Sequence, residues 1–140
     1  MKCIFCDFIS GKSKNHQWKK QYPLIPILET KKIYSFLSVP DNNKETHLLI
    51  IPKKHYEFLD QIPKELLNEL MLKITHATKI LKKKYGACHV LLNNGEGADQ
   101  YIPHVHFHII PKDKNKKIIW KNLNPKEFKE VSIELKKEFK

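Results

Sequence analysis

The amino-acid sequence predicts an α+β fold in which two amphipathic helices pack on an antiparallel sheet. Short apolar segments bounded by turn residues indicate strands, and two longer segments carry apolar residues at helical spacing. The predicted strands come in hairpins and do not alternate regularly with helices. With 140 residues, the chain is expected to form one domain over residues 1–140 that buries a core without disulfides.

A first hairpin and a buried strand are predicted in the first half of the chain. Residues 25–29 and 33–37 are largely apolar and flank the polar turn of residues 30–32. Residues 47–51, His-Leu-Leu-Ile-Ile, form a mostly apolar run that Pro52 ends. Such a run is typical of a strand that is buried on both faces.

Two helices are predicted, one in the middle of the chain and one at its end. Pro63 lies in the first turn of the first helix, and Gly86 follows the lysines of its last turn. Asn124 is expected to cap the second helix, because a proline follows it and Glu127 is three residues further on. This helix should run to Phe139. The first helix has an apolar face that consists of Leu66, Leu67, Leu70, Ile74, Ala77 and Leu81.

A second hairpin is predicted from residues 89–93, the turn-rich residues 94–100 and a strand with three histidines at alternate positions, His104, His106 and His108. Successive side chains of a strand point to opposite faces, so the three imidazoles should share one face. The other face carries the apolar side chains Val105, Phe107 and Ile109. Histidine can act as nucleophile, proton donor or metal ligand near pH 7, so we interpret the histidine face as a reaction site.

The residues alone leave two other interpretations of the three histidines open. A chain with eight histidines can contain such a triplet by chance. Alternatively, all three imidazoles could bind one metal ion, since neutral imidazole is a common zinc ligand.

The formal net charge of +11 arises from lysine alone, because the chain contains no arginine. Without a guanidinium group, any phosphate must be held by histidine, amide, backbone N–H or ammonium groups. The positive charge favours an anionic substrate. Nucleic acid is not favoured as the main partner, because the lysines are scattered along the chain and not gathered in one stripe with aromatic residues.

A cytoplasmic location without a membrane partner is expected. Residues 1–10 contain no apolar stretch long enough for a signal peptide, and the apolar run of residues 48–52 is too short to span a bilayer. In a reducing compartment, the pair Cys3 and Cys6 indicates a metal or redox site more often than a structural disulfide.

Five motifs follow one another along the chain: Cys3-Ile4-Phe5-Cys6, Ile27-Leu28-Glu29, residues 46–55, residues 93–100 and residues 104–110. Their order resembles that of the histidine triad family of nucleotide hydrolases and transferases. These motifs lie mostly within residues 3–111, which we take as the family core, with residues 112–140 as a C-terminal extension. The resemblance implies a five-stranded antiparallel sheet, one long central helix and a homodimer.

The same resemblance implies a purine nucleotide or a nucleotide conjugate as substrate, cleaved at its α-phosphate. His106 would attack the phosphorus and form a nucleotidyl-histidine, which water then hydrolyses. His108, Asn93 and Gln100 would contact phosphate oxygens. The nucleoside would be bound by residues of the second predicted strand and its end, namely Phe36, Ser38 and Val39.

A structural zinc site is also implied by the resemblance. In the zinc-bearing relatives, the cysteine pair is completed by the histidine before the buried strand and by the first histidine of the triad. The corresponding residues are Cys3, Cys6, His47 and His104. Four protein ligands leave no open coordination position, so such a site would hold the fold together and not activate water.

The chain departs from the family pattern at several places, and two of these departures bear on the expected activity. Ser38 replaces an aspartate that usually binds the ribose hydroxyls, and Tyr101 replaces a small hydroxyl residue. The segment between Phe8 and Ile27 is longer than usual. The leading hypothesis is a nucleotide phosphoramidase. The alternatives are a dinucleoside polyphosphate hydrolase, a nucleic-acid deadenylating enzyme, a non-catalytic nucleotide-binding module, and a zinc hydrolase that uses all three histidines.

Overall fold

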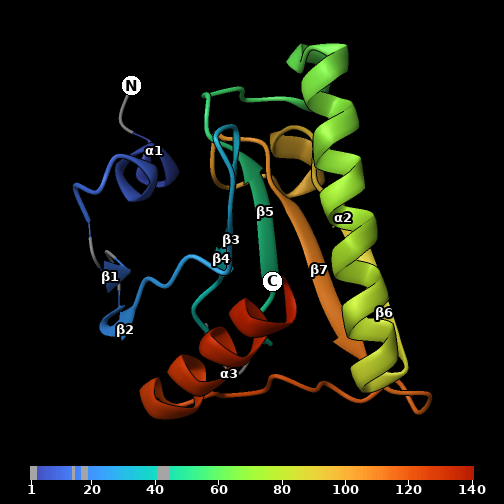
Figure 1. Ribbon diagram of the computed structural model, residues 1–140. Coiled ribbons are helices and arrows are strands. Elements are labelled where there is room, and N and C mark those ends of the chain that lie inside the picture. The colour runs from blue at the N-terminus through green and yellow to red at the C-terminus, as the bar shows by residue number, and fades with distance from the viewer. Residues whose placement is uncertain (1–2, 14, 17–18, 41–44) are drawn as a thin grey trace.

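The computed structural model describes residues 3–13, 15–16, 19–40 and 45–140. Three α-helices and two sheets make up the described chain, together with short 3₁₀ segments at Leu59–Gln61 and Glu96–Ala98 (Figure 1). The helices are α1 (Ile4–Ile9), α2 (Lys64–Tyr85) and α3 (Pro125–Glu138). The strands are β1 (Asn15–His16), β2 (Lys19–Pro23), β3 (Leu28–Glu29), β4 (Ile33–Leu37), β5 (Leu48–Pro52), β6 (Ala87–Leu92) and β7 (Phe107–Lys112).

The main sheet has five antiparallel strands in the order β3-β4-β5-β7-β6, which confirms the predicted fold class. Strands β4 and β5 are fully buried along their length, as the apolar run of residues 47–51 predicts. The register aligns Phe36 of β4 with Leu49 of β5, and Leu49 with His108 of β7. These three side chains therefore lie in one row on the same face of the sheet.

The two faces of the sheet have different coverings, as Figure 1 shows: α2 lies on one side and α1 on the other. The first face packs against α2 and α3 in a large core that includes Leu70, Leu81 and Phe128. The second face packs against α1 through Phe5 and Phe8. Because both faces are covered, both sets of side chains on β4 and β5 are apolar or buried.

The histidine segment keeps its alternation but enters the sheet later than predicted. Val105, Phe107 and Ile109 are buried in the α2 core, as expected for one face of an extended segment. However, strand β7 begins only at Phe107. Before it, the backbone N–H of Val105 donates to the Tyr56 carbonyl and not to a neighbouring strand. This hydrogen bond holds the first part of the histidine segment outside the ladder.

The predicted helix ends agree closely with the structure. Helix α2 begins directly after Pro63 and ends at Gly86, whose φ of 110° is readily accessible only to glycine. Asn124 and Glu127 form the capping box of α3: Asn124 Oδ1 accepts from the Glu127 N–H, and Glu127 Oε1 accepts from the Asn124 N–H. No helix in the described residues is long and apolar enough to cross a membrane.

The long segment between Phe8 and Ile27 contains structure that the sequence patterns did not predict. Strands β1 and β2 form a separate two-stranded sheet, and they follow α1. His16 of β1 is buried between the rings of Phe8, Phe36 and Phe128, with ring centroids 5.4–6.1 Å apart. The additional segment thus becomes part of the wall on the second face of the sheet.

Candidate active site

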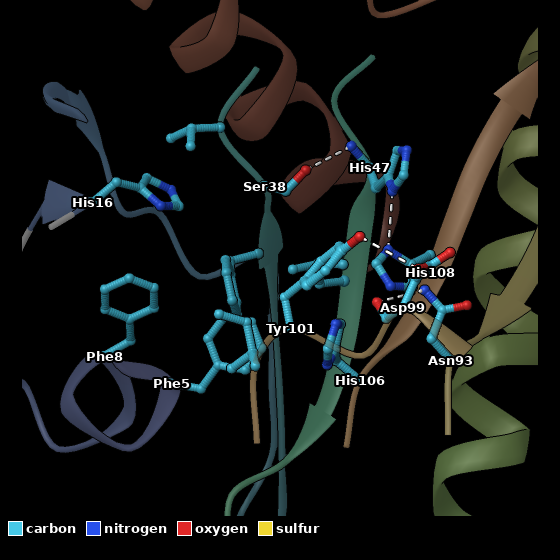
Figure 2. Close-up of a pocket in the computed structure, with 14 residues that line it drawn as sticks. Phe5, Phe8, His16, Ser38, His47, Asn93, Asp99, Tyr101, His106 and His108 are labelled. Atoms are coloured by element: carbon cyan, nitrogen blue, oxygen red, sulfur yellow. Dashed lines mark hydrogen bonds between the residues drawn. The ribbon is translucent and has the colours of Figure 1, made fainter. Parts of the chain in front are cut away.

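A cavity of about 480 Å³ opens on the second face of the sheet. One end is aromatic and is formed by Phe5, Phe8, His16 and Phe36. The other end is polar and includes His108, and His106 lies between the two ends (Figure 2). The remaining lining residues are Ser38, Val39, His47, Leu49, Asn93, Asp99, Tyr101 and Ile102. The cavity volume is within the range of small-molecule sites.

His106 is buried in the cavity wall, with 7% of its surface exposed. Its Nδ1 lies 2.7 Å from the main-chain carbonyl oxygen of His104. Because a carbonyl oxygen can only accept, Nδ1 carries the hydrogen and Nε2 keeps its lone pair. Burial also lowers the pKa of His106 below 6.5. His106 is therefore a neutral imidazole with one nitrogen fixed and the other available for attack.

His108 and His47 form a pair at the polar end of the cavity, with their Nδ1 atoms 2.9 Å apart. Burial lowers the pKa of both, and that of His108 falls to about 3, assisted by positive charge on His106 or His47. Two neutral imidazoles can make this contact only if one donates and the other accepts. His108 Nε2 is buried and has no hydrogen-bond partner among the described residues, so it is available for a ligand.

Glu45 lies next to this histidine pair. Its Oε1 is 3.9 Å from His47 Nε2, and its carboxylate also accepts from Lys112 Nζ at 2.9 Å. The carboxylate raises the pKa of His47 and so opposes the effect of burial. The arrangement stabilises a proton on His47 more than on His108.

A second cluster contains Cys3, Cys6, His55 and His104, whose possible ligand atoms lie within 4.8 Å of one another. His104 Nδ1 is 3.5 Å from Cys3 Sγ and 3.6 Å from Cys6 Sγ, and His55 Nδ1 is 3.3 Å from Cys6 Sγ. On its other side, His104 Nε2 donates to the Pro52 carbonyl at 2.8 Å. That hydrogen bond leaves the Nδ1 lone pair directed at the two sulfur atoms.

The expectation that His47 joins the cysteines is wrong. His47 precedes β5 and His55 follows its end, so the two histidines lie at opposite ends of this strand. Cys3, which caps α1, and Cys6 within α1 lie beside the end that carries His55, while His47 contacts His108. The sequence motif contains both histidines eight residues apart, and only the direction of β5 relative to α1 distinguishes them.

The donor chemistry of this cluster fits a zinc ion. Two sulfur atoms and two imidazole nitrogens form the Cys2His2 set that zinc prefers in structural sites. Burial and the neighbouring Cys3 raise the pKa of Cys6 to about 11, so a thiolate here requires a nearby cation. The fixed Nδ1 lone pair of His104 provides the oriented ligand that such a site needs.

Gln100 does not line the cavity, in contrast to the expectation from the sequence. Its Oε1 accepts from the Gly95 N–H at 2.7 Å, and its Nε2 donates to the carbonyls of Glu57 and Ile102 at 2.7 and 3.1 Å. These bonds satisfy the amide, and they position the loop between β6 and β7. The side chain therefore supports this loop and does not line the cavity.

The other expected nucleotide residues do line the cavity: Phe36, Ser38, Val39, Asn93 and His108. Ser38 Oγ accepts from the His47 N–H at 2.9 Å and retains its own hydrogen for a ligand. Asn93 Nδ2 donates to the Asp99 carbonyl at 3.3 Å.

Phe5, Phe8, His16 and Asp99 also line the cavity, although the sequence patterns did not single them out. Burial lowers the pKa of His16 to about 4, so this imidazole is neutral at pH 7. Phe5 packs edge-on against both His104 and His106, with centroids 5.8 and 5.3 Å apart. The sequence held one signal for Phe5, which is its position between the two cysteines. A residue between two metal ligands lies close to the sheet face on which the metal site is built.

Comparison with known proteins agrees with this geometry. An adenosine 5'-monophosphoramidase from Candida albicans is 39% identical over 116 residues, which cover 79% of this chain and 70% of that protein. One from Schizosaccharomyces pombe is 30% identical over 146 residues and is matched over the full length of both chains. A crystal structure of a zinc-bound histidine triad family protein from Mycobacterium smegmatis has a TM-score of 0.75, covers 99% of this chain and 96% of that one, and is 22% identical, which shows a common fold. Residues 19–115 match the HIT domain model, and the chain therefore belongs to the HIT domain family, named for the histidine triad.

Proposed function

We propose that this protein hydrolyses purine nucleoside 5'-phosphoramidates through a covalent intermediate on His106. The observation that carries the proposal is the 2.7 Å hydrogen bond from His106 Nδ1 to the His104 carbonyl, which leaves Nε2 as a neutral nucleophile in the cavity. Two similar proteins are adenosine 5'-monophosphoramidases, which supports the same reaction class for this chain.

The different chemistry of the two ends of the cavity supports one orientation of the substrate. The purine base packs among Phe5, Phe8 and Phe36, and the ribose lies near Ser38. The α-phosphate then lies over His106, with Asn93 and His108 as hydrogen-bond donors to its oxygens. This placement uses the free Nε2 of His108, which becomes a donor when its Nδ1 accepts from His47.

The reaction proceeds in two displacements at phosphorus. In the first, the lone pair of His106 Nε2 forms an N–P bond while the bond from phosphorus to the amine breaks, and the amine nitrogen takes the electron pair and a proton from the solvent. In the second, a water oxygen attacks phosphorus and gives up a proton to the solvent, the N–P bond breaks, and the electron pair returns to Nε2. The products are a nucleoside monophosphate and an amine. Positioning and charge stabilisation by the surrounding residues provide most of the rate enhancement in such transfers.

A zinc ion bound by Cys3, Cys6, His55 and His104 is proposed as a structural cofactor. The donor set supports it, and the similar fold from Mycobacterium smegmatis is described as zinc-bound. When bound, zinc would cross-link α1 to the histidine segment. With four protein ligands it would have no open coordination position. Since thiolate ligands require reducing conditions, we place the protein in the cytoplasm.

A homodimer is proposed through the free edge of β6. This strand lies at the end of the sheet order, and its Val90 and Leu91 are 49% and 43% exposed. Helix α2 exposes Met71 and Leu72 as well. An open strand edge with exposed apolar side chains is suited to pairing with a second copy of the chain. Light scattering should give twice the monomer mass for the wild type and the monomer mass for Val90→Lys combined with Leu91→Lys. A monomeric wild type would contradict the proposal.

The proposed activity is tested by the turnover of adenosine 5'-phosphoramidate. His106→Ala should lower kcat by at least about a thousandfold, because the covalent route is lost. His76→Ala, on the exposed part of α2, is the matched control and should retain wild-type turnover. Equal kcat values for His106→Ala and the wild type would overturn the proposal.

A further inference from the structure

We propose that Asp99 selects the leaving group of the substrate by its charge. Its carboxylate favours a neutral or cationic amine and disfavours an anionic leaving group such as a phosphate, a sulfate or a carboxylate-bearing amine. This inference rests on the proposed function and concerns the substrate class of the same site.

The geometry of the cavity places the leaving group near Asp99. The base belongs at the aromatic end with Phe5 and Phe8, and the reacting phosphorus lies at His106 in the middle. A substrate that runs from base to leaving group must therefore extend toward the polar end. Figure 2 shows Asp99 and Asn93 at that end, away from Phe8 and His16.

The charge of the cavity wall differs from the charge of the protein. The chain carries a net charge of +11 from its lysines. Yet none of the fourteen lining residues that the structure describes is a lysine. Asp99 is the one acidic side chain among them, and the histidines of the wall are neutral at pH 7 because burial lowers their pKa. A site built for a polyphosphate would instead need several cations against the phosphate oxygens.

The negative charge continues beyond the cavity. Tyr101 also lines a neighbouring cavity of about 400 Å³, whose wall includes Glu57 and Glu96. No lysine is among the described residues of that wall either. A leaving group that passes Tyr101 therefore meets further carboxylates, which attract an extended cationic amine and repel an anionic group.

The backbone of Asp99 is held in place by its neighbours. Its φ of 65° lies in the left-handed region, which aspartate adopts more readily than most residues. The Asp99 N–H donates to the Glu96 carbonyl at 3.0 Å, and the Asp99 carbonyl accepts from Asn93. Tyr101 donates to the carboxylate across 3.4 Å. These contacts fix the position of the charge relative to the phosphate site.

Charge selection follows from the first displacement. When the P–N bond breaks, the amine nitrogen takes the electron pair and one proton and leaves as a neutral amine, and a basic amine then takes a second proton from water and becomes an ammonium ion. The nearby carboxylate attracts this cation. An anionic leaving group places a second negative charge near Asp99, and at several ångströms in a partly exposed site this repulsion lowers the rate by about tenfold.

The test uses three adenosine 5'-phosphoramidates that differ only at the far end of the amine. The amines are 1,4-diaminobutane, butylamine and 4-aminobutanoate, which are cationic, neutral and anionic beyond the same P–N bond. We expect kcat/KM of the wild type to decrease in that order. Asp99→Asn should reduce the ratio of kcat/KM between the cationic and the anionic substrate by about tenfold, and less at high salt than at low salt. Asp99→Glu retains the charge and should retain the wild-type order.

Different results separate the inference from the proposed function. Turnover of all three substrates with an unchanged ratio in Asp99→Asn would overturn the inference and leave the proposed activity intact. The same holds if Asp99→Glu alters the ratio as much as Asp99→Asn does, because position and not charge would then matter. No turnover of any of the three by the wild type would overturn both.

Discussion

His104 and His106 are joined by a hydrogen bond in which the Nδ1–H of His106 donates to the main-chain carbonyl of His104 over 2.7 Å. The same His104 directs its side chain to Cys3 and Cys6, while His106 faces the cavity. The metal cluster and the proposed nucleophile are thus connected through one residue. Changes at these two histidines should have different consequences.

Replacement of the two histidines should separate covalent chemistry from stability. His106→Ala should abolish turnover and lower the unfolding free energy only modestly. His104→Ala removes a fully buried side chain and its hydrogen bond to Pro52, and should cost about 2–4 kcal/mol. Chemical denaturation measured beside kcat distinguishes the two effects. Equal losses of stability in both variants would contradict this division.

Metal content should identify the fourth ligand. We expect one zinc per chain in the wild type, a large loss in His55→Ala and Cys3→Ala, and full retention in His47→Ala, because His47 contacts His108 instead. Elemental analysis of the purified variants measures this directly. Loss of zinc in His47→Ala with retention in His55→Ala would show that the described cluster is not the site.

The stability of the fold should increase with pH between about 4 and 6.5. Burial lowers the pKa of His16 from 6.5 to about 4, so in this range the unfolded chain binds more protons than the folded chain. The stabilisation is complete above pH 6.5 and is lost as pH falls toward 4. His16→Phe should reduce this pH dependence by an amount on the order of 2–3 kcal/mol. Identical slopes of unfolding free energy against pH in both proteins would contradict the account.

The His47–His108 pair should affect catalysis more than substrate binding. His47→Ala removes the partner of His108 Nδ1, so His108 no longer holds a defined tautomer toward the phosphate. We expect kcat to fall about a hundredfold with a smaller change in KM. Glu45→Gln, which leaves the imidazoles in place, should cause a smaller loss and shift the pH profile of kcat. An unchanged kcat in His47→Ala would exclude this role.

Local patterns predicted much of the fold. The apolar run of residues 47–51 predicted that β5 is buried on both faces, and Asn124 and Glu127 predicted the capping box of α3. The buried face of the histidine segment followed from the alternation of Val105, Phe107 and Ile109. The late start of β7 did not, because it depends on a distant hydrogen bond from Val105 to Tyr56.

The candidate site was harder to predict from the sequence than the fold, because it depends on which residues distant in the sequence lie side by side. His55 and His47 both flank β5, and only the position of α1 decides which one meets the cysteines. Likewise, His16 comes from the long segment after α1, which carries no recognisable motif. Asp99 lies in a loop that looks like an ordinary turn, and its place in the cavity wall depends on how Gln100 anchors that loop.

The central claim is that Nε2 of His106 becomes bonded to the substrate phosphorus. Single-turnover reaction with adenosine 5'-phosphoramidate, an alkaline quench and peptide mass spectrometry measure this bond directly. The account predicts an adenylyl group on the peptide that contains His106, assigned by fragmentation to that residue, and its absence in His106→Ala. An adenylyl group on His108 or on no histidine, with turnover intact, would contradict the account.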